Sequence, residues 1–206
     1  MEPLSTMKIQ EFSPELLCSW MPKHGKFGRM GVLGDGSCFF HSVCALKNKD
    51  NYLYVSPKKQ KEIAYEFRCQ FAKHFTKEEY KKFSKVSKHA DSYEVEHDGF
   101  CSPKVWADEV MIRHASKILN LNLIFLDLKN FKAYCGVHGH ETQDSKTKQS
   151  TGLIAWVSRS HFEPIVRIDD AEEGLITTIF EPHKNEKDAN LVESIMDKYF
   201  KSCEIE

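Results

Sequence analysis

The chain has 206 residues, of which 41% are hydrophobic and 29% charged, and its formal net charge is -1. This length suits one compact domain, and the composition is typical of a globular protein rather than a disordered one. The near balance of charges argues against nucleic acid as the partner of the whole chain. The sequence has no stretch near the roughly 18 apolar residues of a membrane helix, nor the basic-then-apolar start of a targeting signal. We therefore expect an intracellular protein that binds neither nucleic acid nor membranes.

The sequence contains seven cysteines, an odd number without the dense, paired spacing of a secreted disulfide scaffold. We interpret them as reduced thiols. Most are expected to be small apolar residues or surface residues without a special role. Cys38 is the exception, because of its position in the chain.

The first part of the chain predicts two helices separated by a loop. A serine, a proline and a glutamate in succession predict the start of a short helix over about 14–20. Five glycines between residues 24 and 36 predict a loop with several tight turns. Residues 38–47 then predict a helix with one apolar face, so Cys38 would lie at its N-terminus.

Three further helices have start signals in the sequence. A serine-proline pair opens the first at Pro57, and large apolar residues at steps of four give it a stripe: Ile63, Phe67 and Phe71. Thr76 and Glu79 have the spacing of a capping box for a basic helix through about Val86. A second serine-proline pair predicts a long helix over about 102–120.

The later part of the chain predicts strands over residues 121–128, 131–137, 152–157 and 161–168. The first is almost continuously apolar, as in a central strand buried on both faces, and the second is its expected hairpin neighbour. Residues 138–150 are polar and predict an exposed loop. Residues near the end have helical apolar spacing: Leu191, Ile195 and Tyr199. Helices first and a mixed sheet later predict an α/β or α+β sandwich.

A cysteine at a helix N-terminus is a candidate nucleophile, because unpaired amides and the helix dipole stabilise its thiolate. The glycines before Cys38 would let the backbone amides near Ser37 and Cys38 converge, as an oxyanion hole requires. His161 is the best placed base, since it begins a predicted strand. Glu163, two residues later, would lie on the same side of that strand and orient the imidazole. This arrangement predicts acyl transfer through a thioester.

Three blocks of sequence resemble the ovarian tumour (OTU) family of deubiquitinating cysteine proteases. Residues 34–40, GDGSCFF, resemble the nucleophile motif of that family. Residues 106–109, WADE, followed by a helix and a buried strand, resemble its middle block. Residues 161–165, HFEPI, resemble its closing histidine block. The blocks occur in family order and the resemblance covers roughly residues 28–168.

The resemblance implies a papain-like fold that hydrolyses isopeptide bonds at the C-terminus of ubiquitin without a metal or an organic cofactor. Cys38 would be the nucleophile and His161 the base, with an oxyanion pocket around Asp35, Gly36 and Ser37. In this family the acid may come from the cysteine block or from the second residue after the histidine, so both Asp35 and Glu163 are candidates. We favour Glu163 for orienting the ring and Asp35 for shaping the loop.

Residues 1–27 would form an N-terminal extension and residues 169–206 a C-terminal extension with an amphipathic helix packed on the same domain. The expected partners are ubiquitin or polyubiquitin chains, met by a monomer in the cytoplasm, which would be the host's if the protein comes from a virus or a bacterium. The arginines in the tail of ubiquitin suggest Glu94 and Glu96 as contacts, with Trp106 as a further candidate. Two alternatives stay open: an enzyme of this fold acting on another ubiquitin-like modifier, and a ubiquitin-binding module without activity.

Other interpretations of the same residues were weighed. Cys135, His138 and His140, with Cys101 or His97 as a fourth ligand, would give a zinc site, although their spacing matches no common structural site. The lysines of residues 77–88 alternate with glutamates, which favours a solvated helix face over a nucleic-acid patch. As an alternative to a substrate contact, Trp106 is expected in the core with the aromatic residues at 67 and 71.

Overall fold

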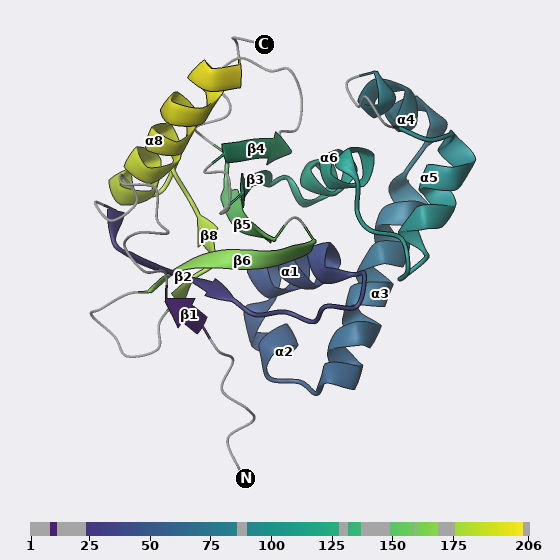
Figure 1. Cartoon of the computed structure of the whole chain (residues 1–206), viewed down its shortest axis with the longest axis horizontal. Coiled ribbons are helices and arrows are strands. Elements are labelled where there is room, and N and C mark those ends of the chain that lie inside the picture. The colour runs from purple at the N-terminus through teal and green to yellow at the C-terminus, as the bar shows by residue number, and fades with distance from the viewer. Residues whose placement is uncertain are drawn as a thin grey trace.

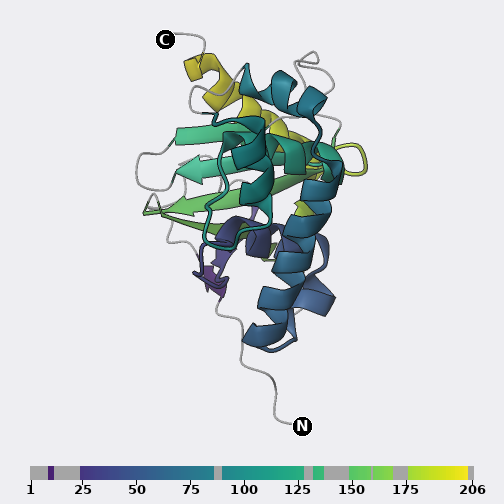
Figure 2. The same ribbon diagram turned by 90° about the vertical axis from the view of Figure 1, so that its right-hand side faces the viewer.

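The computed structural model describes residues 9–11, 24–85, 90–127, 132–136, 149–158, 160–168 and 176–203. A central sheet is flanked by helices on both faces, with α8 on one side and the other helices gathered on the opposite side (Figures 1 and 2). The sheet is mixed, because one pair of its strands is parallel and the others are antiparallel. The predicted α/β sandwich is confirmed.

The sheet has the strand order β1-β2-β6-β5-β3-β4, with β7 added beside β6 and β8 beside β5. β3 and β5 form the parallel pair. The strands are β1 (Ile9–Glu11), β2 (Lys26–Met30), β3 (Asn122–Asp127), β4 (Lys132–Gly136), β5 (Thr151–Val157), β6 (His161–Ile168), β7 (Ile176–Thr177) and β8 (Ile179–Phe180).

Several helices begin where the sequence supplies capping groups. Ser56 precedes a proline and its side chain accepts a hydrogen bond from the Lys59 amide, while Thr76 and Glu79 form the predicted capping box. Among the described residues, no helix is both long and apolar enough to cross a membrane. The helices are α1 (Cys38–Lys47), α2 (Lys49–Leu53), α3 (Pro57–His74), α4 (Lys77–Ser84), α5 (Tyr93–Phe100), α6 (Glu109–Leu119) and α8 (Glu186–Cys203).

Strand β3 is buried along its whole length because its two faces contact different layers. Leu123 and Phe125 belong to a core cluster shared with helices α1, α3 and α6. Ile124 and Leu126 alternate with them and pack in a second cluster with four residues of α8: Leu191, Val192, Ile195 and Met196. The C-terminal helix therefore covers one face of the sheet and shares its core.

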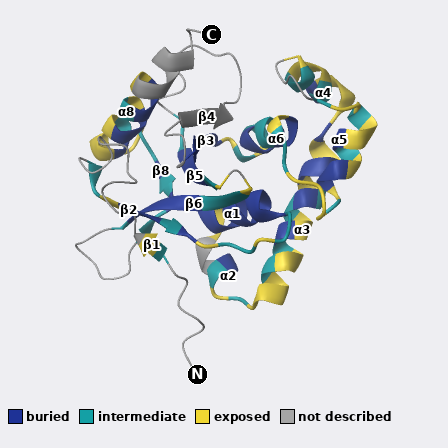
Figure 3. Ribbon diagram, viewed as in Figure 1, coloured by how far each residue is buried: buried dark blue, intermediate teal, exposed yellow. Residues whose placement is uncertain are grey.

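Helix α1 is the most enclosed helix, with nine buried residues from Cys38 to Leu46 (Figure 3). Its large apolar side chains enter the core between the sheet and α3, and among them Phe39, Phe40 and Val43 are at most 1% exposed. A helix buried on all sides in this way has little freedom to shift, since neighbouring side chains fill the space around it. The backbone of Cys38, at the N-terminus of this helix, therefore also has little freedom to shift.

The structure differs from the sequence predictions at several elements. Strand β2 lies inside the glycine-rich segment that was predicted as a loop. Its Phe27 and Met30 are fully buried, and Gly28 allows β1 to approach, since a Cβ there would lie 2.7 Å from Cγ2 of Ile9. Helix α5, helix α2 and the short strands β7 and β8 were not predicted. The predicted helix over 14–20, and most of the predicted loop over 138–150, lie outside the described residues.

The predicted long helix over 102–120 is wrong in its first part. Helix α6 begins only at Glu109, because Asp108 is the N-cap and its Oδ1 accepts a hydrogen bond of 2.8 Å from the Met111 amide. The preceding residues are turns whose carbonyl groups are used elsewhere, as described below. They connect α5 to α6 and pass beside the loop that carries Cys38.

Leu191 tests the contribution of α8 to the fold. It is fully buried against the sheet, so replacing it with alanine leaves a cavity in that core cluster. We expect Leu191→Ala to lower the free energy of unfolding by about 2–5 kcal/mol in a urea titration. Glu193→Ala, at an exposed position of the same helix, should change it little. Equal stability of the two variants would contradict this packing.

Candidate active site

Cys38 is the first residue of α1, and it is buried, although 7% of its surface remains exposed to solvent. The first turn contains no acidic residue, and the Ser37 side chain does not cap the helix. The positive end of the helix dipole therefore acts on the cysteine without a competing carboxylate in that turn. This is the environment that stabilises a thiolate.

His161 begins β6 and lies beside Cys38. The two side chains are hydrogen-bond partners, and this contact is the largest cause that raises the pKa of His161 to about 9. Glu163 is the next cause, and its Oε1 lies 3.5 Å from Nε2 of the ring. Burial opposes both effects. The imidazolium is therefore the main form of His161 at neutral pH, as a thiolate-imidazolium pair requires.

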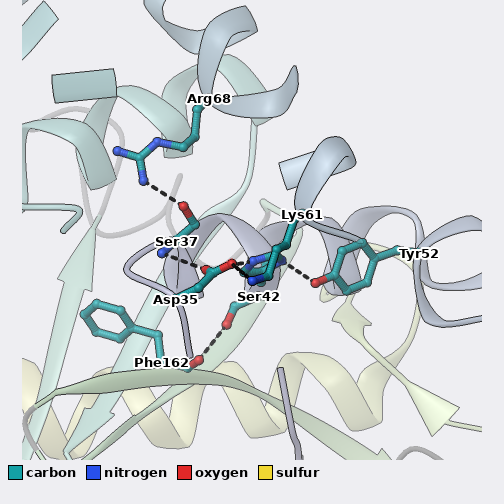
Figure 4. Close-up of polar contacts among 8 residues, drawn as sticks. Asp35, Ser37, Ser42, Tyr52, Lys61, Arg68 and Phe162 are labelled. Atoms are coloured by element: carbon teal, nitrogen blue, oxygen red, sulfur yellow. Dashed lines mark hydrogen bonds and ion pairs between the residues drawn. The ribbon is translucent and has the colours of Figure 1, made fainter. Parts of the chain in front are cut away.

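A hydrogen bond joins the two segments that supply these residues. The hydroxyl of Ser42 in α1 donates to the carbonyl oxygen of Phe162 in β6 at 3.0 Å (Figure 4). The Phe162 ring also packs edge-on against Phe39 and Phe125. The residue next to His161 is thus fixed to the helix that begins with Cys38.

Asp35 contacts the cysteine loop and helix α1 rather than His161. Its Oδ1 accepts hydrogen bonds from the Ser37 amide at 3.2 Å and from Nε2 of His41 at 3.0 Å, and its Oδ2 lies 3.7 Å from Nζ of Lys61 (Figure 4). Among the described residues, the carboxylate beside the His161 ring is that of Glu163. Glu163 is thus the carboxylate that faces the His161 ring, while Asp35 contacts the loop that carries Cys38.

His41 extends the Asp35 network into the core. It is fully buried, and burial lowers the pKa of its imidazole, so the ring is neutral and has one N–H group. Its Nδ1 lies 2.5 Å from the hydroxyl of Tyr52. The arrangement is satisfied when Nε2 donates to Asp35 and the Tyr52 hydroxyl donates to Nδ1. Sequence reasoning missed both residues, although a histidine on an apolar helix face is a signal for such a contact.

Two glycines of the loop before Cys38 lie close to other segments, and at position 36 the structure requires a glycine. Gly36 has a φ of 82°, and a Cβ there would lie 2.6 Å from the carbonyl oxygen of Pro103. Gly34 lies next to the imidazole ring of His161, since a Cβ at Gly34 would lie 3.7 Å from Cε1 of that ring. The Ser37 amide donates to Asp35, so the predicted contribution of this amide to an oxyanion hole would compete with that hydrogen bond.

Arg68 on α3 ties the cysteine loop to the segment between α5 and α6. Its guanidinium is fully buried and donates to the carbonyl groups of Phe100 at 2.6 Å, Gly99 at 2.7 Å and Val105 at 2.9 Å. It also donates to the Ser37 hydroxyl at 3.1 Å (Figure 4). Burial lowers its pKa to about 10, so it stays charged at neutral pH. The sequence indicates this buried role only weakly, through the position of Arg68 on the same face of α3 as its buried apolar residues.

The three candidate substrate contacts have different environments. Glu94 is exposed and pairs with Lys77 at 3.1 Å. Glu96 is only 3% exposed and accepts a hydrogen bond from the Asp91 amide at 2.9 Å, so the expectation that it contacts a partner is wrong. Burial, followed by a hydrogen bond with Asp108, raises its pKa to about 7. Trp106 is 56% exposed rather than in the core, and it lies beside Gly36.

The alternative sites are not assembled in the described part of the chain. No group of three or more histidine, cysteine, aspartate or glutamate residues there could hold a metal ion. His138 and His140 lie outside it, as does the side chain of Cys135. The basic helix α4 is amphipathic, and its lysines pair with glutamates, as Lys82 does with Glu78.

Arg68 offers a test of how the loops are held. Arg68→Met keeps the aliphatic stem but removes the donor to the Ser37 hydroxyl and to the carbonyl groups of Phe100, Gly99 and Val105, of which the first two are buried. We expect it to lower the free energy of unfolding by about 3 kcal/mol or more in a urea titration. Lys58→Met removes the same charge from an exposed position of the same helix and should have little effect. If both variants unfold alike, Arg68 does not have this role.

Comparison with known proteins gives structural matches alone. No protein-family model matches the sequence, and no curated protein matches it significantly. An OTU domain solved in complex with ubiquitin is 16% identical, with a TM-score of 0.53 over 84% of this chain and 88% of that one. The OTU domain of OTUD1 is 16% identical, with a TM-score of 0.50 over 69% of this chain and 86% of that one. The Hazara virus OTU bound to ubiquitin is 15% identical, with a TM-score of 0.50 over 81% and 93%. The chain therefore has the fold of ovarian tumour (OTU) domains.

Proposed function

We propose that the protein is a cysteine deubiquitinase that hydrolyses isopeptide bonds at the C-terminus of ubiquitin. The observation that carries the proposal is the contact between Cys38 at a helix N-terminus and His161, whose ring also faces Glu163. A protein that only bound ubiquitin would have no physical need for a thiol and an imidazolium in contact. The OTU fold supports the same conclusion, since two of the matching structures are complexes with ubiquitin.

The side chains support a complete acyl-transfer cycle. The Cys38 thiolate attacks the carbonyl carbon of the isopeptide bond, and backbone amides near the helix N-terminus stabilise the oxyanion. The lysine amine leaves with a proton from His161, and a thioester remains between ubiquitin and Cys38. Neutral His161 then takes a proton from water, whose oxygen attacks the thioester. The thioester intermediate then expels the Cys38 thiolate while His161 keeps the proton from water, and the proton of the product carboxylic acid passes to the released lysine amine. The products are a carboxylate and an ammonium group, and the thiolate-imidazolium pair is regenerated.

The substrate class and the compartment follow from this activity. Ubiquitin conjugates occur in the cytoplasm, where reduced thiols such as Cys38 persist. A related modifier is the second candidate substrate, since selectivity between such partners is distributed over a protein surface. Exposed Trp106 and Val105, which border the cysteine loop through Gly36 and Arg68, are the side chains through which a partner could be distinguished.

Reaction with a ubiquitin that carries a C-terminal electrophile tests the nucleophile and the substrate class. We expect a covalent adduct, measured by intact mass, which disappears in Cys38→Ala. Cys44→Ala is the matched control, because this thiol lies in the same helix but is fully buried, and burial raises its pKa to about 12. A parallel probe built on another ubiquitin-like modifier reports selectivity. Binding of ubiquitin without any adduct would favour the inactive binding module instead.

The pH dependence tests the role of Glu163. The imidazolium form of His161 is lost as pH rises through its pKa of about 9, so kcat/KM should fall along an alkaline limb there. Glu163→Gln removes a carboxylate that raises this pKa and should move the limb to lower pH by about one unit. Asp35→Asn, which alters a carboxylate that does not contact the ring, should leave the limb in place. An unmoved limb in Glu163→Gln would show that Glu163 does not act on His161.

A further inference from the structure

Glu163 is held by two partners, one at each carboxylate oxygen. Oε1 faces Nε2 of His161, as described above, while Oε2 lies 3.0 Å from Nη1 of Arg29 on the neighbouring strand β2. The Glu163 side chain is only 13% exposed. Oε2 is buried and makes no hydrogen bond among the described residues, so the ion pair with Arg29 is the charged contact that it has there. Arg29 is therefore the cation that compensates this buried oxygen.

The other edge of the Arg29 guanidinium is held by strand β1. Arg29 and Gln10 are directly opposite each other in the β1-β2 pair. Oε1 of Gln10 accepts a hydrogen bond of 3.0 Å from Nε of Arg29 and a second one from Nη2. The remaining terminal nitrogen of the guanidinium, Nη1, faces Glu163. The planar guanidinium thus contacts one strand through two hydrogen bonds to Gln10 and another through the ion pair with Glu163.

The length of the Glu163 side chain is the reason why its ion pair with Arg29 matters for the position of the carboxylate. A glutamate has one more rotatable bond than an aspartate, so without a second contact its carboxylate would adopt several positions around the His161 ring. The ion pair with Arg29 selects one of them. Because β1 lies before the region that resembles the OTU family, sequence comparison alone would not connect it with the active site.

We propose that Arg29 is a positioning residue for the proposed active site, acting on His161 through Glu163, and that Gln10 of strand β1 holds Arg29 in place. This inference rests on the proposed function. Arg29 does not take part in bond making. Its effect is to keep Glu163 aligned with the imidazole, which in turn stays aligned with the Cys38 thiol.

Kinetics with a ubiquitin substrate test the proposal. We expect Arg29→Met to lower kcat roughly 10- to 100-fold with little change in KM, because misplacement of a reacting group slows the chemistry more than the binding. Arg29→Lys should restore activity only in part, since an ammonium cannot bridge Gln10 and Glu163 with fixed directions. Gln10→Ala should have a smaller effect of the same kind. Lys26→Met, with the same charge change at the other end of β2, should keep full activity.

A double variant separates action through Glu163 from any other role. In the Glu163→Gln background, Arg29→Met should have almost no further effect, because the residue through which it acts has already been changed. Effects that multiply in the double variant would overturn the proposal. So would a change in KM alone, which would mean that Arg29 contacts the substrate instead.

A spectroscopic measurement keeps the test independent of turnover. In protein with ¹⁵N-labelled histidine, the Nε2–H proton of His161 should be protected from solvent exchange by Glu163, and its NMR signal should broaden in Arg29→Met but not in Lys26→Met. If the unsubstituted chain reacts with no ubiquitin probe, the proposed function fails, and this signal still decides the role of Arg29. A signal unchanged in Arg29→Met would overturn that role.

Discussion

The packing of helix α1 against strand β6 is the constraint on which the rest of the site depends. Cys38 and His161 are far apart in sequence, and they meet because α1 is buried against the sheet and Ser42 is hydrogen-bonded to the Phe162 carbonyl. Core packing of this density does not allow small shifts without cost. The distance between thiol and imidazole is therefore a property of the core rather than of a surface loop.

Around this contact, charged groups join segments that are far apart in the sequence. Arg68 joins the cysteine loop to the turns after α5, Asp35 joins that loop to His41, and Arg29 joins Glu163 to β1. Arg68 is fully buried, while the side chains of Asp35 and Arg29 are about a quarter exposed, and each makes hydrogen bonds or ion pairs. Such contacts contribute less to net stability than to fixing one geometry, because any other arrangement would leave a buried charge unpaired.

Local signals in the sequence were sufficient for much of the fold and for proposing Cys38 and His161, which the structure places in contact. The capping residues Ser56 and Thr76 predicted helix starts, and the apolar run of β3 predicted burial on both faces. The start of α6 was misplaced, because a serine-proline pair competed with the true N-cap at Asp108. Arg29 and Arg68 were missed since their partners lie on distant elements, and burial of Glu96 depends on packing that no local pattern records.

The hydrogen bond from Ser42 to Phe162 spans 120 residues of sequence, and this separation has a consequence for synthesis. A ribosome releases the chain from its N-terminus, so the segment with Cys38 emerges well before the strand with His161. During that interval the thiol has neither its base nor the closed core around α1, and contacts of such long range form slowly. On the proposed function, hydrolytic activity would therefore arise late, after most of the chain has folded.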